Sequence, residues 1–106
     1  MKKLLLTILF TLVLSGNAYS FYNYGEYKNM KKSDPKLLNR YIFGLGSGLL
    51  FATINQKEWC VPENLRLNTN NYFSIIDDYA KRSNAPDDEL VVALLFYGFK
   101  TTFPCK

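Results

Sequence analysis

Apolar residues recur at intervals of three and four along the chain, the spacing that places side chains on one face of an α-helix. The longest such stretch predicts a helix over residues 35–56. It begins with good signals, because Asp34 can cap the free amides of the first turn and Pro35 forfeits no hydrogen bond at the first helical position. Its apolar stripe consists of Leu38, Tyr41, Ile42, Leu45, Leu49 and Ala52.

Two more helices are predicted in the second half of the chain. One covers residues 67–83, with Asn68 or Thr69 as its cap. Its apolar side carries Tyr72, Ile75, Ile76 and Tyr79, and its polar side carries Asp77, Asp78, Lys81 and Arg82. The other begins at Pro86 and is almost wholly apolar over residues 90–99. The acidic residues that complement the dipole at its start are Asp87, Asp88 and Glu89.

A short helix over residues 24–32 precedes these three, and no strand pattern of comparable length competes with them. The pattern therefore predicts an all-α fold, a small four-helix bundle of three main helices and a short N-terminal one.

Three glycines interrupt the longest predicted helix, at Gly44, Gly46 and Gly48. A phosphate-binding loop is rejected, because such a loop follows a strand and usually ends in Lys and Ser or Thr. Gly44 and Gly48 are four residues apart and share a helix face, while each glycine weakens a helix by roughly 1 kcal/mol relative to alanine. We therefore expect another helix to pack closely against that face, with a kink in the glycine-bearing helix as the alternative.

The first 20 residues have the three parts of an export signal. Lys2 and Lys3 provide the positive start, residues 4–14 the apolar stretch and residues 18–20 the small-residue cleavage site. The apolar stretch is too short to span a bilayer, which takes about 20 residues. No cysteine follows Gly16 as a lipid anchor would require. We expect a cleaved signal peptide over residues 1–20 and a soluble periplasmic domain over residues 21–106.

The chain has two cysteines, Cys60 and Cys105, and export would place them in an oxidising compartment. Two cysteines allow one intramolecular pairing, so a single disulfide is predicted. In the chain-entropy model, closing this loop would stabilise the fold by about 4 kcal/mol. Trp59 and Phe103 are expected to pack around the disulfide.

The composition argues against an enzyme. The chain has no histidine, so it lacks the usual near-neutral general base and the commonest metal ligand. The carboxylates cluster at Asp77-Asp78 and Asp87-Asp88-Glu89. Adjacent positions on a helix point in different directions, so neither cluster forms a matched acid–base pair. No catalytic residue, metal or cofactor is predicted. The formal charge of +4 falls to +2 when Lys2 and Lys3 leave with the signal, which removes the main support for a nucleic-acid partner.

The order of several short segments resembles the Rap/Tai family of type VI secretion immunity proteins. These segments are Tyr41-Ile42-Phe43-Gly44, Cys60-Val61-Pro62, and Leu90-Val91-Val92-Ala93-Leu94 leading to Phe103-Pro104-Cys105. Residues 68–71 and 83–86 differ from the glutamine-containing and His-Pro-like stretches typical of the family. The resemblance implies an exported, disulfide-bonded helical bundle that binds and blocks a peptidoglycan-cleaving amidase.

A short turn before the last helix is the predicted contact with this partner. A loop held between two rigid helices can enter a cleft that a flat helix face cannot. The predicted contact residues are Ser83, Asn84, Ala85, Pro86 and Asp87. An ordinary helix connection, whose Asn and Pro serve only turn and cap, is an equally good interpretation of the same residues.

Two further expectations concern partners and class. A homodimer is predicted through the apolar last helix or the glycine-bearing helix, and the family resemblance points the same way. The alternative function is a small periplasmic acid-stress chaperone, which would also be helical, exported and disulfide-bonded. The two functions differ in gene context, since an immunity gene is expected beside a gene for an exported amidase.

Overall fold

The computed structural model describes residues 21–53, 55, 58–62 and 65–105, and these residues form four α-helices and no strand. The predicted signal peptide, residues 1–20, lies outside the described part of the chain. The helices are α2 Tyr24–Ser33, α3 Pro35–Ala52, α4 Thr69–Ser83 and α5 Val91–Thr102. The prediction of an all-α fold with three main helices and a short N-terminal one is confirmed.

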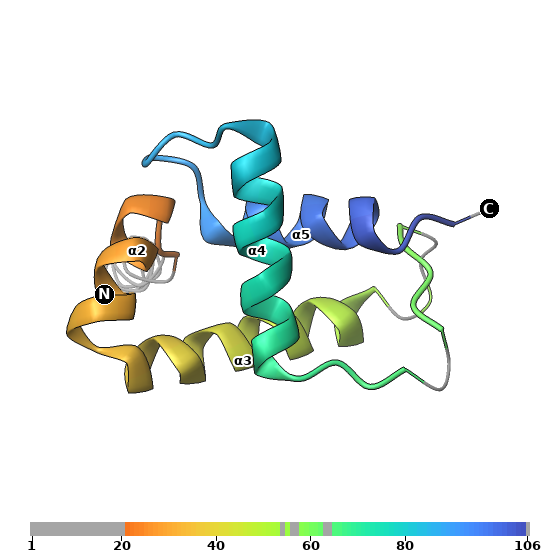
Figure 1. Cartoon of the computed structure of the whole chain (residues 1–106). Coiled ribbons are helices and arrows are strands. Elements are labelled where there is room, and N and C mark those ends of the chain that lie inside the picture. Colours follow the sequence, from red (N-terminus) through yellow and green to blue (C-terminus); the bar gives the residue numbers. More distant parts are fainter. Residues whose placement is uncertain (1–20, 54, 56–57, 63–64, 106) are drawn as a thin grey trace, which may run out of the picture.

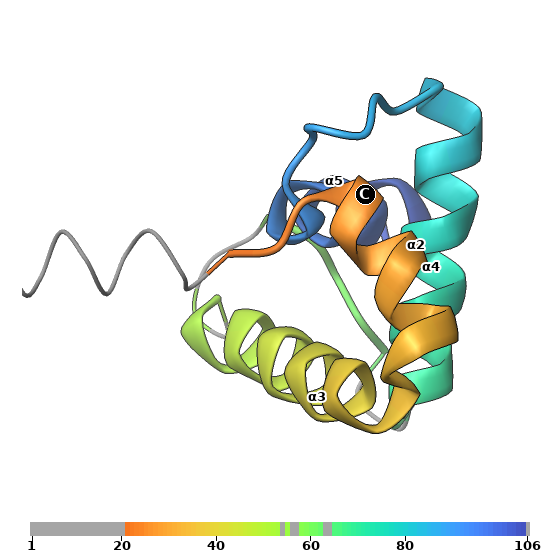
Figure 2. The ribbon, with the colours of Figure 1, turned by 90° about the vertical axis from the view of Figure 1, so that its left-hand side faces the viewer.

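Helix α4 organises the bundle (Figure 1). It runs across both α3 and α5 and makes its most extensive contact with α5, while α2 packs on α3 (Figure 2). The core lies between these helices, and the predicted stripes of α3 and α4 pack in or against it, except Ala52, which is exposed. Its fully buried large side chains are Tyr27, Leu38, Ile42, Ile76, Val91, Leu94, Leu95 and Phe99.

Local polar caps explain where three helices begin. The Asn23 side chain accepts from Glu26 N–H at 2.8 Å, and the Glu26 carboxylate accepts from Asn23 N–H at 3.2 Å. Asn68 and Asn71 form the same reciprocal pair at the start of α4, so Asn68 is the cap. Asp34 accepts from Leu37 N–H at 3.3 Å ahead of α3, as predicted. Each pair satisfies amides that the helix itself leaves free.

The start of the last helix was predicted wrongly. Helix α5 begins at Val91 rather than Pro86, and the acidic residues lie in the turn before it. The reason is a competing set of partners, because Tyr24 N–H donates to Glu89 O at 2.8 Å and Gly25 N–H donates to Asp87 O at 2.9 Å. These carbonyls satisfy the first amides of α2 and so hold the segment outside a helix.

The prediction that a helix packs closely against Gly44 and Gly48 was also wrong. A methyl group at Gly44 or Gly48 would meet nothing within 4 Å, so no helix packs against that face in the described structure. The close approach is at Gly46, where a methyl group would lie 2.5 Å from the Tyr72 ring. Helix α3 also ends at Ala52, before the predicted Gln56, which lies outside the described residues.

The predicted disulfide joins Cys60 to Cys105, with Cα atoms 5.0 Å apart. It ties the segment after α3 to the end of the chain, and Cys60 N–H donates to Phe103 O at 2.8 Å beside it. Trp59 is buried against Phe96 and Phe99, with ring centroids 5.2 and 5.0 Å away. The disulfide therefore lies next to an aromatic cluster at one end of α5.

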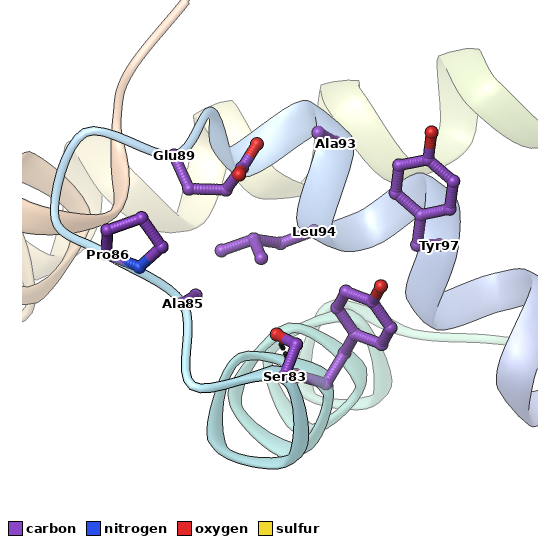
Figure 3. A pocket seen from close by; sticks show the side chains of 8 residues that line it. Ser83, Ala85, Pro86, Glu89, Ala93, Leu94 and Tyr97 are labelled. Atoms are coloured by element: carbon purple, nitrogen blue, oxygen red, sulfur yellow. Dashed lines mark hydrogen bonds between the residues drawn. The ribbon is translucent and has the colours of Figure 1, made fainter.

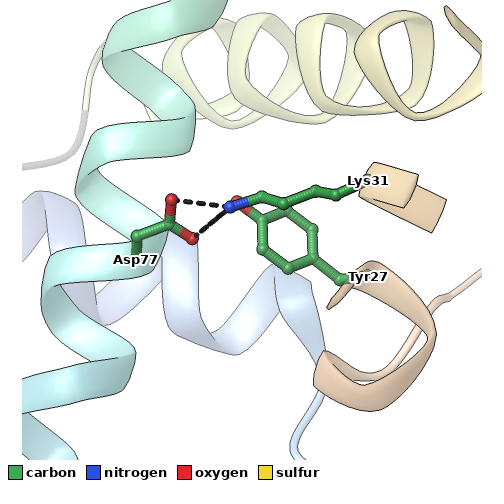
Figure 4. A network of polar contacts seen from close by, with 3 residues as sticks. All are labelled: Tyr27, Lys31 and Asp77. Carbon is green, nitrogen blue, oxygen red and sulfur yellow. Dashed lines mark hydrogen bonds and ion pairs between the residues drawn. The ribbon is translucent and has the colours of Figure 1, made fainter. Parts of the chain in front are cut away.

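A polar cluster links α2 to α4 (Figure 4). The Tyr27 hydroxyl donates to Asp77 at 2.9 Å, and Lys31 pairs with the same carboxylate at 2.7 Å. The ring of Tyr27 is fully buried, and the Lys31 ammonium lies 4.7 Å from its centroid. Asp77 was predicted on the polar side of α4, but it is half-buried and serves as the link between the two helices.

Candidate partner-binding site

The predicted contact residues form the end of α4 and the first part of its connection to α5, at an outer edge of the molecule (Figures 1 and 2). Ser83 is the last residue of α4, and the other four follow it. All are exposed except Ala85, which is half-buried. The structure thus places the whole predicted set on one accessible segment.

Asn84 has a clear structural role at the end of α4. Its backbone is in the left-handed region, with φ 52° and ψ 53°, and its N–H donates to Ala80 O and Lys81 O. Ala85 N–H donates to the same Ala80 carbonyl at 2.9 Å. Left-handed residues end helices in this way, and asparagine tolerates the conformation better than most residues. The turn-and-cap interpretation therefore applies to Asn84.

The segment is also held from its other side by α2. Besides the two bonds from Tyr24 and Gly25, Val91 N–H donates to Tyr22 O at 3.0 Å. Asp87 pairs with Lys28 of α2 at 2.8 Å, and this hydrogen bond raises the pKa of the lysine ammonium. Both side chains are largely exposed, so the ion pair positions the turn more than it stabilises the fold. The connection is short and anchored at both ends.

A pocket of about 150 Å³ opens between the connection, α4 and α5 (Figure 3). Its lining residues are Tyr79, Ser83, Ala85, Pro86, Glu89, Ala93, Leu94 and Tyr97. Three of the predicted contact residues, Ser83, Ala85 and Pro86, therefore line it. Asn84 and Asp87 do not, since one caps α4 and the other pairs with α2.

The sequence analysis missed the rest of the pocket, although a weak signal was present. Tyr79 and Ser83 are four residues apart on α4, and Ala93 and Tyr97 are four apart on α5. Each spacing gives a shared helix face, and Glu89 lies four residues before Ala93 in the turn that precedes α5. Nothing in the sequence shows that the two faces meet, because that depends on how α4 packs on α5.

Other kinds of site were sought in the described part of the chain. No group of three or more Cys, Asp or Glu side chains there could hold a metal ion. Among the same residues, no helix combines the length and hydropathy needed to cross a bilayer. Comparisons with known protein families, curated proteins and solved structures find no match to this chain.

Proposed function

We propose that the protein is a periplasmic immunity protein that binds a type VI secreted peptidoglycan amidase and inhibits it by occluding its active site. Such an inhibitor blocks the active site by binding in it and needs no catalytic group of its own. The motif resemblance supplies the class of partner, and the export signal supplies the compartment.

One structural observation carries the mode of binding. The connection at residues 83–90 is exposed, yet backbone hydrogen bonds from α4 and α2 fix it at both ends. A segment that is already ordered loses little conformational freedom on binding, so preorganisation favours tight inhibition. The Cys60–Cys105 disulfide adds to this rigidity at the opposite end of α5.

The test is an inhibition assay with the exported amidase encoded beside this gene. The purified protein should suppress hydrolysis of isolated cell walls at a one-to-one ratio and should co-elute with the amidase in size-exclusion chromatography. An unrelated amidase of similar size serves as the specificity control. Full hydrolysis in the presence of excess protein would exclude the immunity function.

We also propose that the protein forms a homodimer, and the described surfaces favour α3 as the interface. Helix α5 buries most of its apolar residues within the bundle, so it has little exposed apolar surface for a second copy to cover. The outer face of α3 instead exposes Phe51 and Phe43 by 80% and 57%, next to the uncovered Gly44 and Gly48. An exposed apolar surface of this kind is suited to packing against a second copy.

A further inference from the structure

The pocket between α4 and α5 has the charge of a cation-binding site. Among its described lining residues, Glu89 provides a carboxylate and none is Lys or Arg. Arg82 precedes Ser83 in the chain, but it pairs with Asp78 at 2.9 Å and does not line the pocket. A positive group that enters the pocket therefore meets no like charge on its described walls.

The helix ends at the pocket have opposite effects on its potential. The last turn of α4 presents the negative end of its dipole through Ser83, while the first turn of α5 presents a positive end through Ala93 and Leu94. These two contributions oppose each other, and the carboxylate of Glu89 is the one full charge on the described walls. Glu89 has no ion-pair partner among the described residues.

Aromatic rings form the far wall of the pocket. Tyr79 and Tyr97 are stacked with centroids 6.1 Å apart, and Tyr97 is 49% exposed. Figure 3 shows Glu89 and Tyr97 on opposite sides of Leu94. Tyrosine faces attract cations, and a planar guanidinium can stack on such a ring while it donates paired hydrogen bonds to a carboxylate.

The size of the pocket limits what it can hold. Sites for drug-sized molecules usually enclose about 300 to 1,000 Å³. This pocket, at about 150 Å³, has room for one side chain rather than for such a ligand. An occupant must therefore arrive as part of a larger molecule or bind weakly by itself.

We infer that the pocket receives the guanidinium group of an arginine on the partner protein, held by Glu89 and stacked on Tyr97. The inference deepens the proposed function and rests on it for the identity of the partner. Pro86 and Ala85 belong both to the predicted contact segment and to the pocket wall. An arginine bound there would lie at the base of the segment that enters the amidase.

The pocket can be tested without the amidase. The isotope-labelled protein is purified from the cells that export it. N-acetyl-arginine amide is titrated into this protein, and backbone amide shifts are recorded by NMR. The arginine probe should give saturable shifts centred on Tyr79, Ser83, Glu89 and Tyr97. The uncharged isostere N-acetyl-citrulline amide should give none. Equal binding of the two probes, or of the matching lysine probe, would overturn the inference, as would no saturable shift with arginine.

A matched pair of variants tests the role of the carboxylate. Glu89→Gln should weaken binding of the arginine probe about tenfold, the usual scale for a lost hydrogen bond between charged groups. Asp88→Asn makes the same change of net charge on the adjacent exposed side chain, which does not line the pocket, and should leave binding unchanged. Equal weakening in both variants would show a general charge effect and overturn the assignment.

Failure of this inference and failure of the proposed function are distinguishable. The probe titration reports on the pocket alone, whereas cell-wall hydrolysis reports on inhibition alone. Inhibition of the amidase without any arginine binding would refute the pocket inference only. Arginine binding without inhibition of the amidase would refute the immunity function, and with it the identity of the partner.

Discussion

The Tyr72 ring lies so close to Gly46 that a methyl group at position 46 would come within 2.7 Å of three of its carbons, on the fixed backbones of both helices. Tyr72 is 3% exposed and has little space to move. We expect Gly46→Ala to lower the free energy of unfolding by about 1 to 3 kcal/mol, because α3 and α4 must separate or the ring must leave its rotamer. Urea unfolding followed by circular dichroism measures this change.

The two neighbouring glycines provide the control. Gly44 and Gly48 are helical, exposed and free of close contacts on the side where a methyl group would lie. At a protein concentration low enough to keep the chain monomeric, Gly44→Ala and Gly48→Ala should therefore each raise the free energy of unfolding, by up to about 1 kcal/mol, through helix propensity alone. Equal effects at all three positions would show that α4 does not pack against Gly46 as described.

The buried hydroxyl of Tyr27 should make the fold sensitive to alkali. Burial is the main cause that raises the pKa of Tyr27 far above its ordinary value of 10.0, and the Asp77 carboxylate adds to it. Because the pKa is higher in the folded state, this stabilisation is complete below about pH 10 and is lost as the pH rises further. Tyr27→Phe cannot ionise, so its stability should fall less steeply above about pH 10.

Urea midpoints measured from neutral pH to about pH 11 test this prediction, since that range spans the ordinary tyrosine pKa. Tyr27→Phe also loses a hydrogen bond to a carboxylate and should cost about 1.5 to 3 kcal/mol at neutral pH. Tyr41→Phe is the comparison, because half-burial also raises the pKa of Tyr41, and it should remove a smaller part of the alkaline slope. An unchanged slope in Tyr27→Phe would contradict the buried position of the hydroxyl.

Removal of the disulfide should destabilise the protein strongly. Cys60 and Cys105 are 45 residues apart, and cross-linking a loop of that length is worth about 4 kcal/mol in the chain-entropy model. The double variant Cys60→Ser, Cys105→Ser should unfold at a much lower urea concentration than the oxidised protein. The reduced original protein should match the variant, and mass measurement before reduction should show no free thiol. Two alkylatable thiols in the untreated protein would contradict the pairing.

The helices could be predicted because their signals are local. Asp34 and Pro35 mark the start of α3 within one turn, and Asn68 does the same for α4. The start of α5 depended on contacts from the other end of the chain. The backbone carbonyls of residues 87 and 89, which a longer helix would have used, accept instead from the amides of Gly25 and Tyr24. No local sequence pattern indicates this change of partner.

Tertiary packing also decided which glycine is needed. Spacing alone placed Gly44 and Gly48 on one face, but the side of α3 that α4 covers is the side that carries Gly46. The pocket also depends on tertiary packing, since Tyr79 and Tyr97 meet only after α4 and α5 have packed. The sequence therefore indicated an accessible connection between α4 and α5 but not the pocket beside it.

Self-association through α3 predicts a specific effect of Phe51→Ser. Phe51 is 80% exposed, so its loss should leave the fold intact. If a second copy covers it, burial of the ring is worth about 1.5 to 3 kcal/mol. The dissociation constant of the dimer should therefore rise at least about tenfold in Phe51→Ser. Sedimentation velocity at micromolar concentrations measures this. Leu65→Ser, an apolar loss outside α3, is the control, and a purely monomeric original protein would refute the dimer.

The contact segment itself can be tested by changing its side chains and keeping its backbone. Alanine at position 84 would strain a backbone with φ 52°, so Asn84→Gly is the better change, since glycine adopts this conformation freely. Combined with Asp87→Ala, it should raise the concentration of protein needed for half-inhibition of the amidase about tenfold or more, because two polar contacts in the cleft are lost.

Lys28→Ala separates this effect from the loss of an ion pair. The Lys28–Asp87 pair is broken in both proteins, but Lys28 lies on α2 and not on the contact segment. Lys28→Ala should therefore inhibit the amidase as well as the original protein does, and the thermal midpoints of all three proteins should lie close together. If the doubly substituted protein also inhibits as well as the original, the amidase is bound elsewhere, and the connection between α4 and α5 is an ordinary helix turn.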